Sequence, residues 1–313
     1  MAAVAAAAAA AALMGYAIQR GGTCMVAAVD EVIHGRRAGK LLAILEAAIW
    51  VAIGLSIAVG VGVSMSFPPG HPLDLMVVPG AVLLGIGARI NGACMFGTVA
   101  RLGSGQWSFA LTPLGFLIGQ ILFLRASTPI GRTLSPGASP MLFATALVLI
   151  PAALFALWRV AGLVQAARQR RLSSHLWSAH GATAVIGLCF VVLMLAVGPW
   201  AYTEALTDLA AGRMASEALR AGLVVALVAG SIFAGAAGGA LRSESPTMRS
   251  AGRCLTGGAL MGMGSLVVPG GNDSLLLVGM PFLQPYAWAA VALMTATIAV
   301  IPFAAPPLAR AAG

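Results

Sequence analysis

The chain has 313 residues, of which 60% are hydrophobic and only 9% are charged, whereas soluble domains carry about 25% charged residues. This composition excludes an ordinary soluble domain and predicts a protein that crosses a membrane several times. The net charge of +9 does not indicate a nucleic-acid partner, because the basic residues, 17 arginines and one lysine, gather in short segments beside apolar runs.

Three basic clusters give the direction in which the chain crosses the membrane. They lie at residues 36–40, 159–171 and 242–253, and the positive-inside rule places all of them in the cytoplasm. Each crossing needs about 20 apolar residues. Together these rules predict an all-α polytopic protein with about nine transmembrane helices and short half-helices between them. In the first half we expect spans at residues 1–19, 41–62, 75–101 and 107–124, and a short segment at residues 22–33 that enters the membrane partway.

The span at residues 75–101 is broken near its middle by the sequence RINGAC, residues 89–94. Irregular backbone at that depth is tolerated only where it is buried in protein or lines a polar cavity. An ionisable residue there indicates a functional site. We therefore expect Arg89, Asn91, Gly92 and Cys94 to lie along a path through the membrane.

After a connecting segment, residues 141–175, the same pattern returns in residues 176–313. The connecting segment comprises an apolar helix at 141–158 and a basic linker. Spans are then expected at residues 180–197, 217–241, 254–282 and 286–304, with a short segment at 200–211. The span at 254–282 is broken by VPGGND, residues 268–273.

The two halves match when the first is shifted by 177 residues. The shift places Gly80, Leu83, Gly85 and Gly87 on Gly257, Leu260, Gly262 and Gly264. The charge clusters assign opposite directions to matched spans. This is the pattern of an inverted-topology repeat, with residues 1–140 as the first repeat and residues 176–313 as the second.

A short helix is expected to begin after each interruption, at Cys24, Met95, Ala201 and Asn272. Helix N-termini expose unpaired N–H groups and carry about half a positive charge. Several such ends meeting near the midplane would stabilise a small anion stripped of water. The alternative is a set of glycine-kinked helices that only pack tightly, and two matched breaks favour the site.

Two of the four cysteines, Cys24 and Cys94, stand at the start of these short helices. That position favours a thiolate or a polarised S–H donor, while the commonest role of a free cysteine is that of a small buried hydrophobic residue. Cys189, in an apolar helix, and Cys254, beside a basic loop, fit the commoner role. The four cysteines lack metal-ligand spacing, so neither a metal nor a cofactor is expected.

Other residues at the breaks leave alternatives open. Arg89 could add positive field for an anion, extend to the membrane surface, or pair with Asp273 of the other half. Asn272 and Asp273 open the second half-helix, where both are typical capping residues, and Asn272 could also donate to a substrate oxygen. Glu46 is a lone carboxylate in the span 41–62, and the sequence names no partner for it.

Three glycine-rich segments, in their order and spacing, resemble the YeeE/YedE family of bacterial sulfur-transport proteins, whose characterised members take up thiosulfate. They are QRGGTC at residues 19–24, GIGARINGACMFG at 85–97 and GGALMGMGSLVVPGGN at 257–272. The resemblance covers nearly the whole chain. It implies an inverted repeat whose short helices pinch an hourglass-shaped path, along which cysteines pass the anion by weak S–H hydrogen bonds. Cys24 and Cys94 match two of those cysteines, whereas Gly271 stands at the position of the third.

These observations predict a transporter or channel-like permease of the bacterial inner membrane for a small inorganic sulfur anion, thiosulfate first. Because desolvating a dianion costs far more than a weak hydrogen bond returns, helix ends and Arg89 should stabilise the anion and the thiols should select it. Membrane lipid and a cytoplasmic sulfur-carrier protein are the expected partners. No enzymatic motif is present, so no enzyme is expected. The alternatives are transport of another sulfur or selenium species, given Gly271, and a redox sensor or scaffold that uses Cys24 and Cys94.

Overall fold

The computed structural model describes residues 2–63, 68, 70–126, 145–212 and 217–301. The start of the predicted helix 141–158, the end of the predicted span 286–304 and the predicted boundary between residues 140 and 141 lie outside this part of the chain. Six helical stretches within it are long and apolar enough to cross a membrane, or seven if the bent pair Met248–Val267 and Asn272–Gly279 is one crossing. The prediction of a helical polytopic membrane protein is confirmed, while the count of six or seven differs from the predicted nine.

The helices follow the predicted order along the chain. In the first half they are α1 (Ala2–Gly21), α2 (Met25–Gly35), α3 (Gly39–Gly60), α4 (Val77–Asn91), α5 (Met95–Gly103), η1 (Trp107–Ala110) and α6 (Leu111–Ala126). The connecting segment contains α7 (Thr145–Arg168) and α8 (Leu172–Leu176). The second half contains α9 (Ala179–Val197), α10 (Tyr202–Ala210), α11 (Glu217–Ala237), α12 (Met248–Val267), α13 (Asn272–Ser274), a π-turn at Leu275–Gly279 and α14 (Pro285–Val300).

Two helices are longer than the apolar pattern predicted. Helix α7 continues to Arg168 because alanine, glutamine and arginine are good helix formers even where the sequence is no longer apolar. Helix α12 begins at Met248, inside the basic segment, because Thr247 and Ser250 form a reciprocal capping box. The expected half-helix after the second break is only one turn, α13, before the π-turn begins.

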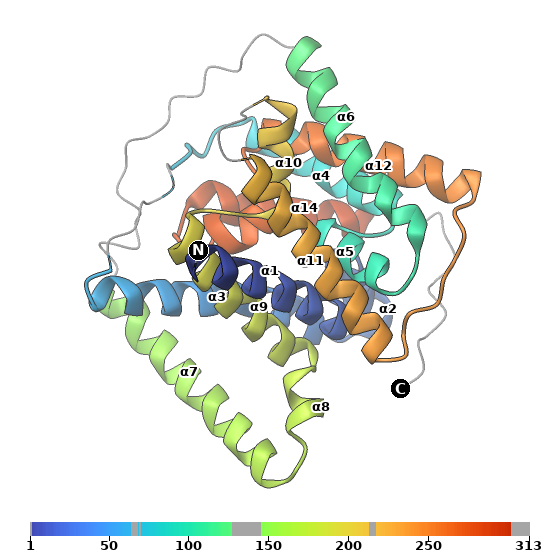
Figure 1. Ribbon diagram of the computed structural model, residues 1–313. Helices are drawn as coiled ribbons and strands as arrows, with labels where there is room; N and C mark the ends of the chain where they lie inside the picture. The colour runs from blue at the N-terminus through green and yellow to red at the C-terminus, as the bar shows by residue number, and fades with distance from the viewer. Residues whose placement is uncertain (1, 64–67, 69, 127–144, 213–216, 302–313) are drawn as a thin grey trace.

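Helices α4 and α12 lie side by side (Figure 1) and touch through glycines. A Cβ added to Gly87 would lie 2.7 Å from the carbonyl oxygen of Gly257, and a Cβ added to Gly264 would lie 2.8 Å from that of Gly80. Because Gly80 faces Gly264 and Gly87 faces Gly257, the two helices run antiparallel. We call these four glycines the α4–α12 seam. Small residues at such a contact let transmembrane helices approach to backbone distance.

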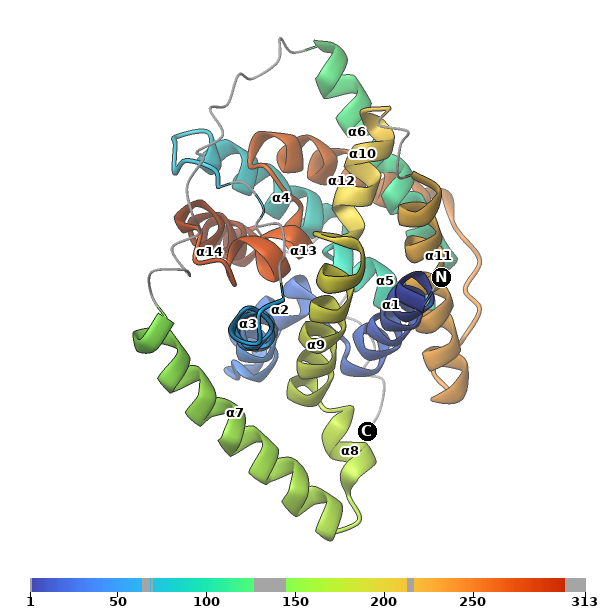
Figure 2. The same cartoon turned by 60° about the vertical axis from the view of Figure 1, so that its left-hand side comes forward.

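Helices α1 and α11 form a second glycine-based contact, visible in Figure 2. A Cβ on Gly15 of α1 would lie 1.8 Å from the carbonyl oxygen of Leu227, and a Cβ on Gly230 of α11 would lie 1.9 Å from that of Ala12. Neither position has space for a side chain. The alanine-rich start of the chain is therefore a packed helix of the bundle.

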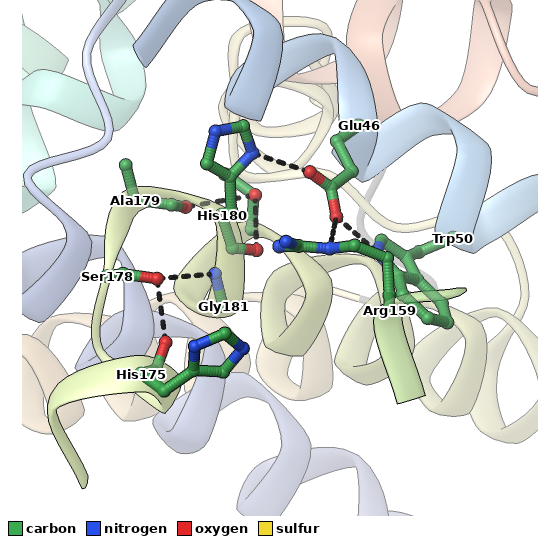
Figure 3. A network of polar contacts seen from close by, with 9 residues as sticks. Glu46, Trp50, Arg159, His175, Ser178, Ala179, His180 and Gly181 are labelled. Carbon is green, nitrogen blue, oxygen red and sulfur yellow. Dashed lines mark hydrogen bonds and ion pairs between the residues drawn. The ribbon is translucent and has the colours of Figure 1, made fainter. Parts of the chain in front are cut away.

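Helix α7 runs along one edge of the molecule (Figures 1 and 2) and is joined to the bundle by Glu46 of α3 (Figure 3). Glu46 Oε1 accepts hydrogen bonds from Arg159 Nε of α7 at 2.8 Å and from Trp50 Nε1 at 3.1 Å, and Oε2 contacts His180 Nδ1 of α9 at 2.6 Å. The Glu46 side chain is 6% exposed. Glu46, for which the sequence named no partner, is therefore the residue that joins α3, α7 and α9.

Replacing Glu46 with glutamine is expected to lower the free energy of unfolding by about 2 kcal/mol. Breaking a buried ion pair costs about 3–5 kcal/mol, and the partial exposure of Arg159 and His180 reduces this value. Thermal unfolding in detergent measures the change, with Glu244→Gln, at an exposed position, as the control. Equal midpoints for the two variants would contradict the assignment.

Candidate functional site

The first turns of four short helices meet inside the bundle. Helices α2, α5, α10 and α13 have as N-cap residues Cys24, Cys94, Ala201 and Gly271, all with extended backbone, and none of these side chains caps its own helix. A glycine with positive φ, a conformation that only glycine adopts readily, precedes each start. These glycines are Gly22 (φ 57°), Gly92 (φ 78°), Gly198 (φ 83°) and Gly270 (φ 128°). The predicted interruptions are thus real breaks between helices, and the break between α12 and α13 bends the chain by 51°.

Neighbouring short helices supply caps for three of these four helices. The Met95 N–H of α5 donates to Asn272 Oδ1 at 3.1 Å, the Met25 N–H of α2 donates to Cys94 Sγ at 3.2 Å, and the Thr203 N–H of α10 donates to Asp273 Oδ2 at 2.9 Å. The starts of α2, α5 and α10 are therefore each fixed by a side chain at the start of another short helix. We call this cluster of four helix starts the waist.

The two thiols at the waist are buried and adjacent. Cys94 is fully buried and Cys24 is 7% exposed, both are free, and the N–H of Met25, the residue after Cys24, donates to Cys94 Sγ. A Cβ added to Gly97 would lie 2.4 Å from Cys24 Sγ, so this thiol rests on the first turn of α5. Both cysteines therefore lie at helix N-termini inside the bundle.

Asn272 carries a donor that the protein leaves unused. The side chain is 2% exposed, its Oδ1 accepts from Met95, and its Nδ2 has no hydrogen-bond partner within the described residues. An unpaired buried donor costs about 1–3 kcal/mol. At the start of α5 and α13, this NH₂ group adds a donor to a site that already attracts negative charge.

Asn91 and Gly92 shape the turn before α5. Asn91 Nδ2 donates to the Ala93 carbonyl at 2.7 Å and to Thr98 Oγ1 at 3.2 Å, and Asn91 Oδ1 accepts from Thr112 Oγ1 at 2.9 Å. Gly92 ends α4 in the left-handed conformation. These two residues position Cys94 through the backbone.

Arg89 forms its ion pair with Asp30. Arg89 Nη1 lies 2.6 Å from Asp30 Oδ1 and Arg89 Nε donates to the Ile301 carbonyl at 2.8 Å. Asp273 instead accepts hydrogen bonds from the backbone N–H and the hydroxyl of Thr203. Of the alternatives for Arg89, pairing with Asp273 is therefore wrong.

Gly271 has a threonine in the space beside it. A Cβ added at this position would lie 2.3 Å from Thr203 Oγ1. The position that would carry the third thiol of the family pattern is thus filled by the hydroxyl-bearing side chain of α10. Thr203 was not singled out by the sequence, because the contact joins residues about 70 positions apart.

Arg101 is a second residue that the sequence analysis did not single out. It lies in the last turn of α5, and its Nη2 donates to the Gly92 carbonyl at 3.4 Å, in the turn before Cys94. Its guanidinium donates to the Gln106 side chain at 2.9 Å and lies 5.3 Å from the Phe109 ring centre. The signal in the sequence was a second arginine shortly after the break at residues 89–94.

A cavity of about 360 Å³ reaches the waist from the side of the second half. We call it the vestibule. Its polar lining comes from His71, Glu204, Arg220, Ser274, Gln284 and Tyr286. Ser274 belongs to α13, so the cavity ends beside the helix start that carries Asn272.

Sequence comparison identifies one family. A family model described as sulphur transport matches residues 20–300, which is nearly the whole chain. No match was found among curated proteins.

Proposed function

Because the chain belongs to the YeeE/YedE sulphur-transport family, we propose that it carries thiosulfate across the bacterial inner membrane through the waist. The sulfur cargo and the membrane location follow from the family and from the apolar helices. The choice of thiosulfate, the path and the residues along it are our proposal. A cytoplasmic sulfur-carrier protein is the proposed acceptor of the cargo.

The observation that carries the proposal is the buried meeting of helix starts around an unused donor. At this point the N-termini of α5 and α13 supply positive field, Asn272 Nδ2 supplies a free donor, and Cys94 and Cys24 supply S–H groups. These groups are hydrogen-bond donors or sources of positive field, and all of them suit a small anion. Asp273 is held by Thr203 at the start of α10.

Two sets of contacts support the inverted repeat. The hydrogen-bonded pair Met95–Asn272 is separated by 177 residues, the same number as the sequence shift, so it lies where a two-fold axis between the repeats would pass. In the α4–α12 seam, a two-fold rotation that relates residues 177 positions apart would exchange the contact Gly80–Gly264 with the contact Gly257–Gly87. Such self-complementary contacts are those expected of a two-fold relation.

The repeat gives the proposed number of crossings. Six apolar stretches and the bent pair make seven, and α7 and α14 add two more, which gives the nine predicted crossings. Residues 1–140 then form the first repeat, residues 141–175 the connection and residues 176–313 the second repeat. The waist is the narrow part of the hourglass between them.

We assign different tasks to the path residues. The helix starts and Asn272 compensate the charge of the anion, while the thiols of Cys94 and Cys24 select a sulfur species by contacts that polarisable sulfur favours. Asn91, Gly92 and Gly271 shape the backbone of the path. Because Arg89 is paired with Asp30, we propose that it holds α2 against α4 and contributes only a weak field to the anion.

Replacing Cys94 with alanine is expected to lower thiosulfate uptake about tenfold, because one hydrogen bond to a charged group is worth about 1.5–3 kcal/mol. The measurement is uptake of labelled thiosulfate by proteoliposomes that contain only this protein. Cys189→Ala, which removes a buried thiol of α9, is the control and should match the wild type.

The same experiment separates the proposal from its alternatives. Absence of thiosulfate uptake by the wild type, with uptake of a selenium compound or another sulfur species, would overturn the cargo. The two buried free thiols at the waist also fit a redox sensor, which would predict a Cys24–Cys94 disulfide on oxidation and no flux of any anion.

A further inference from the structure

A narrow cleft opens at the turn before α2, beside the basic segment at residues 36–40. It is lined by residues 21–24 of this turn, by Lys40 and Ile44 of α3 and by Thr183 of α9, and it has a volume of about 10 Å³. Gly22 of this turn corresponds to Pro199 in the shift by 177 residues, and Pro199 lines the vestibule. The cleft and the vestibule thus lie at corresponding turns of the two halves, with the waist between them.

The cleft contains a buried hydroxyl without a partner. Thr23 is 5% exposed and its Oγ1 has no hydrogen-bond partner in the described part of the chain. Thr183 in the same cleft differs, because its hydroxyl donates to the carbonyls of Ala179 and His180. A Cβ added to Gly22, the residue before Thr23, would meet nothing within 4 Å, so the turn has open space at Gly22. The Thr23 hydroxyl is therefore available to a ligand.

The cleft also contains the only lysine of the chain. The backbone N–H of Lys40 donates to Glu31 Oε2 at 3.1 Å, which fixes the start of α3, while its ammonium group has no ion pair within the described residues. Lysine carries a compact charge with rotatable donors, whereas arginine holds oxyanions in a fixed fork. Lysine is therefore suited to a site that binds an anion briefly and then releases it.

We propose that Thr23 and Lys40 form an anion-binding site that receives the sulfur oxyanion from Cys24 on the cytoplasmic side of the waist. The site rests on the proposed transport function. Cys24 lies in the lining of the same cleft, so the cargo passes from thiol to hydroxyl and ammonium without crossing another element. Neither Thr23 nor Lys40 was part of the predicted path.

The cleft must widen before it can hold the cargo. Its present volume admits about one water molecule, and its walls belong to α3 and α9. The contact of Glu46 with His180 at 2.6 Å joins these two helices (Figure 3), and Ile44 and Ala179, which line the cleft, are close to these two residues in the chain. The site therefore forms when α3 and α9 separate next to Lys40.

The test compares thiosulfate transport from the two faces of the membrane, in inside-out and right-side-out vesicles. Lys40→Met and Thr23→Val are expected to raise the thiosulfate KM measured from the cytoplasmic face at least fivefold and to change the KM from the other face less than twofold. Thr23→Ser, which keeps the hydroxyl, should hold the KM within twofold of the wild type, and Lys40→Arg, which keeps the charge, should give a KM at or below the wild-type value.

Two matched controls show whether the effect is local. Thr183→Val removes a hydroxyl of the same cleft that is already bonded within α9, and Arg37→Met removes a neighbouring exposed charge. Both should keep the wild-type KM. Lys40→Met and Thr23→Val variants with wild-type KM values at both faces would overturn the site and leave the transport function standing. A wild type that moves no thiosulfate would overturn both.

Discussion

Replacing Asn272 with aspartate is expected to reduce thiosulfate uptake at least 100-fold while the protein still folds. The new carboxylate oxygen can accept the Met95 N–H as Asn272 Oδ1 does, and aspartate is a good residue at a helix start. The unused NH₂ donor, however, becomes an oxygen that carries negative charge. Two unit charges 4 Å apart repel each other by about 4 kcal/mol at an effective dielectric constant of 20. A 100-fold loss of rate needs only about 2.7 kcal/mol, so the repulsion of a dianion is large enough.

The measurement is initial uptake of labelled thiosulfate by proteoliposomes, at equal protein content and with a monodisperse size-exclusion profile for each variant. Asn272→Ser is the neutral control, because serine keeps a small donor at the start of α13 without adding charge. It should retain more than a tenth of the wild-type rate. Similar uptake by Asn272→Asp and the wild type would show that the anion does not pass this residue.

Replacing Gly230 with valine is expected to prevent stable folding. A side chain at this position of α11 would collide with the carbonyl oxygen of Ala12, 1.9 Å from an ideal Cβ. That oxygen belongs to the backbone of α1 and cannot move without displacing the helix. Overpacking a core costs about 1–3 kcal/mol and occasionally more, and a contact with helix backbone belongs at the upper end of this range.

Gly222→Val on the same helix is the matched control, because a Cβ there meets nothing within 4 Å. We expect the Gly222 variant to give the yield and unfolding midpoint of the wild type, and the Gly230 variant to aggregate on size-exclusion chromatography. Equal behaviour of the two would mean that α1 and α11 are not in direct backbone contact.

Local sequence patterns were sufficient to predict where helices begin and break. Left-handed glycines such as Gly92 and Gly270 end the preceding segments, so the positions of the short helices were correct within a few residues. The length of α7 was underestimated because hydropathy marks the apolar part of a helix, and its arginine-rich end is helical as well.

Contacts between distant segments were not predictable from one sequence. The bonds of Met95 with Asn272 and of Glu46 with Arg159 join residues more than 100 positions apart, and they depend on how each helix is rotated about its axis. For the same reason the interpretation of Arg89 left three alternatives open. Its ion pair with Asp30 of α2 joins residues that are 59 positions apart.

The α4–α12 seam limits the ways in which this protein can change shape. Across it, backbone faces backbone at Gly80, Gly87, Gly257 and Gly264, so sliding one helix past the other would drive side chains of the facing helix into these glycines. The two helices consequently behave as a single rigid post that ties the halves together. Any opening and closing of the passage must come from the short helices and from the α3 and α9 region around this post.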